Sequence, residues 1–410
     1  MRILYLSQYF PPEVGATQTR AYEMARGLLR AGHQVTMLTE LPNHPEGVIR
    51  PSYRGKFWVR EELDGIDVVR VWVKTAPVKT MRTRLAFYLS YMLNAALAGL
   101  VMARGRYDVL VATSPPLFVG GTALFLSGLR RIPLVFEVRD LWPESAVALG
   151  ELKNLRFIRW ATWLEERCYA RARRIVVVTT GILDRLIARG YGEKLALIPN
   201  GANTDLFRPR PEAGRAVRER LGLGDRFVAL YAGIHGVAQG LETVLEAARL
   251  RPEVHFLLIG DGPCKADLVR LHEEMDLPNV TMLDAQPREE IPAYLSAADV
   301  ALVPLRNVEL FQGAVPSKLF DAWACACPVA LSIAGEARAV LERAGGGVYV
   351  EPEAPDQLAA ALGKLSTDRS RCREMGAAGR RFVEAHYSRQ AQARELERLL
   401  RELVSLAYSK

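Results

Sequence analysis

A lysine and an aspartate one helical turn apart are the residues best suited to chemistry in this 410-residue chain. Lys318 and Asp321 follow Pro316-Ser317 at the start of a predicted helix. The ammonium and the positive end of the helix dipole would together attract a diphosphate. The carboxylate only accepts hydrogen bonds, which suits two ribose hydroxyl groups. The pattern indicates a nucleotide diphosphate site, although an exposed first-turn lysine is the commoner origin of such a pattern on its own.

Two glycine-containing turns follow predicted strands and would let a backbone approach phosphates. One is Gly233-Ile234-His235-Gly236, directly after the strand 227–231. The other contains Gly262 and leads into a helix with Lys265 in its first turn. A single Gly-x-Gly is usually only a strand-to-helix turn, so the second turn is the weaker signal.

A third group follows the predicted strand 134–137. Asp140 and Glu144 flank Leu141-Trp142-Pro143, and a carboxylate here would orient an acceptor hydroxyl or take its proton. The alternative is a helix N-cap role for Asp140. Arg139 is either a contact to an acceptor phosphate or a surface residue.

Strands alternate with helices along the chain, which predicts the α/β class with parallel sheets. One series of strands fills residues 1–199 and a second fills 200–389, with 200–225 interpreted as a linker and 390–410 as a helix returning towards the first domain. We expect two doubly wound, Rossmann-like domains, with ligands in a central cleft at the carboxyl ends of the strands.

Residues 85–103 contain no charge, and arginines flank them at 82, 84, 104 and 106. The length would suit a membrane span, but a single crossing would separate strands expected to share one sheet. A buried helix and a helix lying in one leaflet remain, and Tyr88 and Tyr91 suit the second alternative. A basic amphipathic helix at 155–174 supports it weakly.

Composition limits the location and the partners. The net charge of +8 favours anionic partners, but no aromatic–basic motif suggests nucleic acid. Five cysteines without a CxxC pair indicate a reducing compartment, and residues 1–7 do not read as a signal peptide. No Asp-x-Asp motif occurs, and the six histidines lack ligand spacing, so no metal and no cofactor is expected.

Eight short motifs, taken in order, carry a resemblance to a known family. They are Tyr9-Phe10-Pro11-Pro12 with Gly15, Ala31-Gly32-His33-Gln34-Val35, Val138-Arg139-Asp140-Leu141-Trp142-Pro143-Glu144, Ile198-Pro199-Asn200-Gly201, Tyr231-Ala232-Gly233, Gln239-Gly240-Leu241-Glu242, Ile259-Gly260-Asp261-Gly262-Pro263 and Val315-Pro316-Ser317-Lys318-Leu319-Phe320-Asp321. Over nearly its whole length the chain resembles GT-B-fold glycosyltransferases of family 4. It is most similar to bacterial surface-polysaccharide enzymes, among them N-acetylhexosamine and N-acetylfucosamine transferases.

The resemblance implies a retaining, metal-independent transferase that uses a nucleotide-sugar donor, with UDP favoured, and a lipid-linked or glycan acceptor. It implies a cytoplasmic enzyme, peripheral on the inner face of the membrane. Asp140 and Lys318 would be catalytic, and Arg139 and Glu144 would bind the acceptor. The expected donor-binding residues are Gly15, Gly233, His235, Gln239, Gly240, Gly262, Lys265, Ser317, Lys318, Leu319 and Asp321.

The chain departs from the family pattern at three positions. Gly313 replaces the first carboxylate of a Glu-x7-Glu pattern whose second position is Asp321. His235 and Gln239 stand where many members have cations. Two alternatives therefore stay open. One is a nucleotide-sugar epimerase of the same fold, which would need no acceptor, and the other is a non-catalytic, membrane-bound sugar-binding scaffold.

Overall fold

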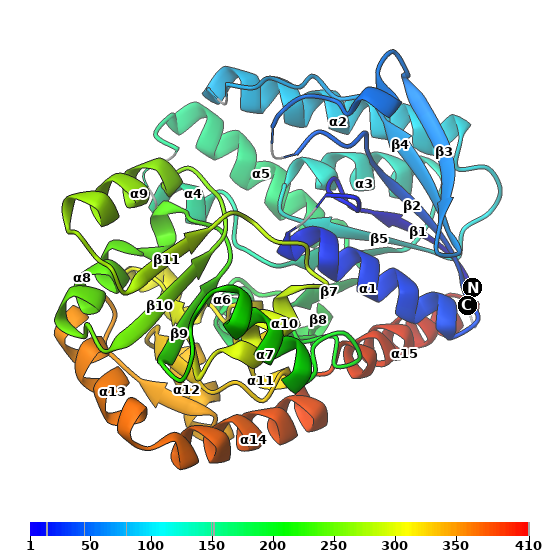
Figure 1. The fold of residues 1–410 in the computed structure, drawn as a ribbon. Coiled ribbons are helices and arrows are strands. Elements are labelled where there is room, and N and C mark those ends of the chain that lie inside the picture. Colours follow the sequence, from blue (N-terminus) through cyan, green and yellow to red (C-terminus); the bar gives the residue numbers. More distant parts are fainter. Residues whose placement is uncertain (14, 45, 79, 149, 151, 409–410) are drawn as a thin grey trace. The chain divides into compact units, whose positions relative to one another are not determined.

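The computed structural model describes residues 1–13, 15–44, 46–78, 80–148, 150 and 152–408. The chain divides into two compact units. Unit 1 comprises Met1–Pro199 with Gln390–Lys410, and unit 2 comprises Asn200–Arg389. Each unit is a sheet flanked by helices (Figure 1), so the α/β prediction is confirmed.

Unit 1 has an eight-stranded sheet in the order β3-β4-β2-β1-β5-β6-β7-β8. Its strands are β1 (Arg2–Leu6), β2 (Gln34–Glu40), β3 (Trp58–Leu63), β4 (Ile66–Val71), β5 (Val109–Ser114), β6 (Leu134–Val138), β7 (Arg174–Val177) and β8 (Leu195–Leu197). Its α-helices are α1 (Ala16–Arg30), α2 (Met81–Val101), α3 (Phe118–Leu129), α4 (Glu144–Ala148), α5 (Leu155–Arg171), α6 (Thr180–Ala188) and α15 (Arg389–Tyr408).

The edge strand β3 is the exception to the parallel pattern, because it pairs antiparallel with β4. Its residues alternate in exposure rather than forming an apolar run, which is why the sequence analysis missed it. The turn Asp64-Gly65 has positive φ at both residues, 49° and 84°, and such a turn closes a two-residue hairpin. The Asp-Gly pair was therefore an available signal.

The C-terminal helix α15 belongs to unit 1 and packs beside α1, so both chain ends lie close together (Figure 1). Leu396 and Leu400 enter the core that contains Ala25 and Leu28 of α1. His33 Nε2 lies 2.9 Å from Glu397 Oε1, a polar contact that fixes the position of the helix along the unit.

Helix α2 has two dissimilar apolar faces. One is buried and contains Tyr91, whose hydroxyl donates to the Leu38 carbonyl at 3.0 Å. The prediction that Tyr91 suits a membrane interface is therefore wrong. The other face exposes Leu93 and Leu97 by 61% and 51%. By length and composition, Arg82–Val101 is the one helix among the described residues that could cross a membrane, and 22% of its apolar window is buried.

Unit 2 has a six-stranded parallel sheet in the order β11-β10-β9-β12-β13-β14. Its strands are β9 (Phe227–Ala232), β10 (Val254–Ile259), β11 (Val280–Leu283), β12 (Val300–Pro304), β13 (Val329–Ser332) and β14 (Gly347–Tyr349). Its α-helices are α7 (Pro211–Arg220), α8 (Glu242–Leu250), α9 (Lys265–Glu274), α10 (Ile291–Ala297), α11 (Ser317–Ala324), α12 (Glu336–Ala344), α13 (Pro355–Thr367) and α14 (Arg369–His386).

The prediction that residues 200–225 form a linker is wrong, because these residues are folded into unit 2. Helix α7 packs against α10, and Val217 is buried. Arg218 Nε donates to the Ala297 carbonyl at 2.7 Å, and its Nη2 contacts Asp299 at 2.7 Å. The arginines, glycines and prolines that suggested a loop are used instead for caps and tertiary hydrogen bonds.

Candidate functional site

The side chain of Lys318 lies beside the carboxyl end of β9 in unit 2, next to Tyr231 and Gly233. Its Nζ is buried and has no hydrogen-bond partner in the described part of the chain. The ammonium lies 3.9 Å from the centre of the Tyr231 ring, a cation–π contact. Burial lowers the pKa of Lys318 to about 7. The lysine thus keeps an unused donor in a dry site, which an anion would satisfy.

Glycines let the neighbouring loops approach this ammonium. A Cβ at Gly233, which has φ 152°, would lie 2.6 Å from Lys318 Nζ. At Gly262 it would lie 2.6 Å from the His235 carbonyl oxygen. Backbone bonds then tie the two turns together, with His235 N–H donating to the Asp261 carbonyl at 2.9 Å. Their close packing explains why larger residues do not fit there.

The His235 imidazole is fully buried, and neither ring nitrogen has a hydrogen-bond partner in the part of the chain that the structure describes. Burial, together with the cations of Lys265 and Lys318, lowers the pKa of His235 to about 4. The ring is therefore neutral at physiological pH, with one nitrogen able to donate and the other to accept. It can contribute hydrogen bonds to a ligand but no charge.

Four other predicted donor residues lie in α9 and α11 of unit 2. Lys265 Nζ donates to the carbonyls of Gly260 and Leu283 at 3.2 and 2.9 Å, so it braces the ends of β10 and β11. Leu319 is fully buried in the core of unit 2. Ser317 is the first residue of α11, and Asp321 lies one turn after Lys318 on the same helix.

The loop before α8 is organised by an arginine that the sequence analysis did not identify. Gly240 has φ 56°, a left-handed conformation that favours glycine, and it directly follows Gln239. Arg306 Nε donates to the Val237 carbonyl at 2.7 Å, and its Nη2 contacts Glu242 at 3.1 Å. Arg306 lies two residues after the end of β12. An arginine this close to the end of a buried strand was the available signal, because its guanidinium can donate hydrogen bonds to the neighbouring loop.

A second polar centre lies in unit 1, at the carboxyl ends of β1, β5 and β6. Glu137 is buried within the apolar strand β6, and its Oε1 accepts from Arg20 Nε at 2.9 Å. Arg20 also donates to the carbonyls of Pro199 and Ile198, both at 2.8 Å. Burial alone would raise the pKa of Glu137, but Arg20 and Arg139 hold it below its usual range.

Arg139 adds unused donors to this centre. Its Nε and Nη1 are buried without a hydrogen-bond partner among the residues described. Burial lowers its pKa to about 10, which leaves the guanidinium charged. Sequence reasoning missed Arg20 and Glu137, although a glutamate inside the apolar run Leu-Val-Phe-Glu-Val signals a buried charge that needs a cation.

Asp140 and Glu144 lie in different surroundings. Asp140 Oδ2 accepts from the Ser145 hydroxyl at 2.8 Å, so the aspartate supports the start of α4. Burial nevertheless raises the pKa of Asp140. Glu144 is half exposed and forms an ion pair with Arg185. Gly15 precedes α1 as its N-cap and leaves the first turn without a side-chain cap.

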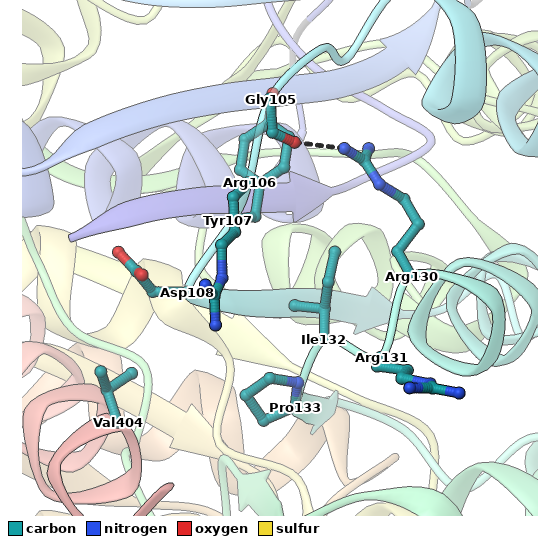
Figure 2. Close-up of a pocket in the computed structure, with 9 residues that line it drawn as sticks. All are labelled: Gly105, Arg106, Tyr107, Asp108, Arg130, Arg131, Ile132, Pro133 and Val404. Carbon is teal, nitrogen blue, oxygen red and sulfur yellow. Dashed lines mark hydrogen bonds between the residues drawn. The ribbon is translucent and has the colours of Figure 1, made fainter. Parts of the chain in front are cut away.

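A hollow of about 730 Å³ lies at the opposite edge of the unit 1 sheet, where β5 and β6 begin (Figure 2). Tyr107 and Pro133 line it. The Arg130 guanidinium turns to the Gly105 carbonyl, whereas the Arg131 side chain points away from the other residues drawn (Figure 2). Doubly wound sheets bind ligands at the other end of their strands, so we do not assign this hollow to the functional site. No three His, Cys, Asp or Glu side chains within the described ranges are grouped to hold a metal ion.

Comparison with protein families decides the identity of both units. Residues 15–201 match the model described as a glycosyl transferase 4-like domain. Residues 215–382 match the model described as glycosyl transferases group 1. The chain belongs to the GT-B glycosyltransferases of family 4.

Related proteins cover nearly the whole of this glycosyltransferase. WcaI of Escherichia coli, a glycosyl transferase named for colanic acid biosynthesis, is 26% identical over 88% of this chain and 91% of its own. Sucrose-phosphate synthase from Thermosynechococcus elongatus aligns with a TM-score of 0.80 at 21% identity, over 99% of each chain. HepE of Anabaena in complex with UDP-glucose aligns with a TM-score of 0.74 at 17% identity, over 98% of this chain and 100% of HepE. The two structures show the shared GT-B fold.

Proposed function

We propose that this glycosyltransferase moves a sugar from a nucleotide diphosphate donor, with a UDP-N-acetyl sugar favoured, to a lipid-linked or glycan acceptor in surface polysaccharide synthesis. The observation that carries the proposal is the buried ammonium of Lys318, which has no hydrogen-bond partner among the residues that the structure describes. The WcaI name supports the polysaccharide assignment, and the UDP-glucose complex of HepE supports the donor class.

The donor diphosphate would supply the counter-charge that Lys318 lacks. Bond breaking between the anomeric carbon and the phosphate oxygen leaves negative charge on the leaving group, which the ammonium and the amino end of α11 stabilise. An anion beside Lys318 also favours its protonated form, so donor binding and charge stabilisation reinforce each other. This arrangement would do the neutralising work without a metal ion.

The acceptor hydroxyl would attack from the face that the leaving phosphate occupies, which retains the anomeric configuration. In this step the new bond joins the acceptor oxygen to the anomeric carbon, and the hydroxyl proton passes to the departing phosphate. Asp140 would orient the hydroxyl by accepting its hydrogen bond. The unused nitrogens of Arg139 would bind an acceptor phosphate.

A transfer assay tests the reaction. Purified protein is incubated in EDTA with UDP- and GDP-sugars and a bacterial lipid extract, and radiolabel is followed into the lipid phase. We expect transfer by the wild type and its loss in Lys318→Ala. Transfer only with added metal would contradict the mechanism. Donor epimerisation without transfer would favour the epimerase, and donor binding with neither activity would favour the scaffold.

We also propose that unit 1 lies on the inner face of the cytoplasmic membrane. Exposed apolar side chains are concentrated on three of its helices, which pack in succession as α2, α3 and α5. They are Leu93, Leu97, Leu100 and Val101 on α2, Phe125 and Leu129 on α3, and Leu155, Trp160 and Trp163 on α5. A face of this kind, bordered by arginines, suits insertion into one leaflet beside anionic headgroups.

Vesicle sedimentation tests the membrane proposal. We expect the protein to bind vesicles of phosphatidylethanolamine and phosphatidylglycerol, and a Leu93→Gln/Leu97→Gln double variant to bind at least about tenfold more weakly, since each leucine buries apolar area in lipid. Leu250→Gln, an exposed leucine of unit 2, is the matched control. Equal binding by all three proteins would contradict the assignment of this face.

A further inference from the structure

Seven aromatic side chains of unit 1 form a continuous row that has no role in the sugar-transfer reaction proposed for this protein. The aromatic row consists of Tyr9, Phe87, Tyr88, Phe118, Trp142, Phe157 and Trp160. Neighbouring ring centroids are 5.2 to 6.4 Å apart. These spacings are those of stacked and edge-to-face contacts, so the rings form one connected surface.

From Phe118 the row branches to Trp142, close to Asp140 in the sequence, and to Trp160 on the outer surface of unit 1. Trp142 follows Asp140 by two residues, and its N–H donates to the Asp140 carbonyl at 3.1 Å. Phe118, at the start of α3, contacts Trp142, Phe157 and Trp160. Trp160 is 36% exposed on α5. The rings therefore connect the carboxyl end of β6 with the outer surface of unit 1.

Most residues of the aromatic row are partly exposed. Phe118 is buried at 1% exposure and anchors the row, whereas the other six rings all remain partly exposed. Six partly open rings in contact offer a surface that a further apolar group can cover.

The surroundings of the row select the kind of group. At its outer end Leu155 is 75% exposed, and Lys153, Arg156 and Arg159 are exposed around it. This combination is complementary to a molecule with a long apolar part and an anionic part. At the inner end, the unused nitrogens of Arg139 provide a further anion contact.

We propose that the aromatic row binds the hydrocarbon chain of an amphiphilic, phosphate-bearing acceptor and guides that chain from the reacting end near Asp140 to the apolar face. The inference rests on the proposed function and names the substrate class more closely. The row would select acceptors by chain length, because each methylene group covered by the rings adds apolar contact.

Binding of n-alkyl phosphates, from butyl to decyl, tests the proposal in the full-length protein by calorimetry below their critical micelle concentrations. We expect affinity to rise about two- to fourfold per methylene until the row is filled, given about 0.8 kcal/mol for each fully buried methylene. Trp160→Ala should bind decyl phosphate at least about tenfold more weakly and butyl phosphate unchanged, and Trp160→Phe should recover most of the loss.

Trp163→Ala is the matched control. Trp163 lies on the same helix and is more exposed, at 52%, but its described ring contact is with Arg167 and not with the row. We expect it to bind decyl phosphate as the wild type does. Affinity independent of chain length would overturn the proposal, as would an equal loss in both tryptophan variants, which would indicate general lipid contact. Urea midpoints confirm that the variants are folded.

The lipid-extract assay separates this inference from the proposed function. Sugar transfer combined with alkyl phosphate binding that is independent of chain length would overturn the proposed role of the aromatic row. The transferase assignment would still stand. Chain-length-dependent binding that only Trp160→Ala weakens, without any sugar transfer, would support the row as an amphiphile site and count against the proposed reaction.

Discussion

In unit 1 the buried carboxylate of Glu137 accepts a hydrogen bond from Arg20 at 2.9 Å, whereas in unit 2 the buried ammonium of Lys318 has no partner within the described ranges. A buried charge is costly unless it is paired. Unit 1 pairs Glu137 Oε1 with Arg20, and of the two carboxylate oxygens only Oε2 has no hydrogen-bond partner among the described residues. Unit 2 leaves Lys318 unsatisfied, and its pKa falls to about 7.

The difference separates structural from functional charge. A charge that the fold compensates stabilises the native state and has little left to offer a ligand. An uncompensated charge destabilises the free protein and is retained where a ligand supplies the compensation. Arg139 is intermediate. The negative charge of Glu137 stabilises its guanidinium, but its Nε and Nη1 have no hydrogen-bond partner among the described residues. The comparison therefore predicts opposite consequences for removing each kind of group.

The largest effect should come from breaking the compensated pair. Glu137→Gln would leave Arg20 and Arg139 buried without a counter-ion, and loss of one partner from a buried pair costs about 3–5 kcal/mol. We expect the free energy of unfolding to fall by that amount in urea titrations. Glu144→Gln is the control, because its ion pair with Arg185 is half exposed and such pairs contribute about 0–1 kcal/mol. A similar loss of unfolding free energy in Glu137→Gln and Glu144→Gln would show that the buried pair is no more stabilising than the exposed one.

Removing the uncompensated charge should instead reduce activity. Lys318→Met keeps the apolar stem but removes the ammonium, and the loss of one preorganised donor costs about 10²–10³-fold in kcat. Lys265→Met is the matched control, since Lys265 already donates to two backbone carbonyls. We expect its kcat to change less than tenfold. Steady-state kinetics, with the donor that the transfer assay identifies, would measure kcat for both variants. A larger loss of kcat in Lys265→Met than in Lys318→Met would assign the phosphate contact to Lys265.

Buried parallel strands were the part of the fold most readable from sequence. The run Val300–Pro304 is continuously apolar and Val254–Ile259 is apolar except for His255, and the structure has β12 and β10 at those same residues. Parallel strands buried on both faces leave this signature. Strand β3 leaves none, because three consecutive charged residues, 60–62, interrupt its apolar residues, and only the Asp64-Gly65 turn marks it.

The candidate site was predictable where local sequence fixes the geometry. Lys318 at the start of α11 follows from the Pro316-Ser317 signal. That Lys265 is used by two carbonyls, or that Arg20 meets Glu137 across 117 positions, depends on tertiary packing. Such pairings are set by the sheet order, which periodicity does not encode. Tyr231 was quoted only as part of a motif, and its ring lies beside the lysine solely because β9 and α11 converge.

A smaller effect is expected in the pH dependence of stability. The pKa of Lys318 is lowered from 10.5 to about 7, so between these values the unfolded chain binds more protons than the folded one. Stability therefore rises with pH in this window, by at most about 1.4 kcal/mol per pH unit. We expect Lys318→Met to lack this rise and to be the more stable protein near pH 7. Urea titrations from pH 6 to 10 measure it. A wild type that follows the variant at every pH would show that Lys318 is already compensated.

The smallest effect concerns how the ring of Tyr231 is held beside the ammonium. Its hydroxyl donates to the Ile234 carbonyl at 2.6 Å, which joins the end of β9 to the glycine loop. Tyr231→Phe removes this bond and keeps the ring, so we expect a loss of about 0.5–1.5 kcal/mol in unfolding free energy and little change in the pH dependence attributed to Lys318. Tyr231→Leu also removes the cation–π contact, which favours the charged lysine, and should lower the pKa of Lys318 further. If Tyr231→Phe altered the pH dependence as much as Tyr231→Leu, the hydroxyl rather than the ring would stabilise the ammonium. Unit 2 would then compensate its buried charge more as unit 1 does.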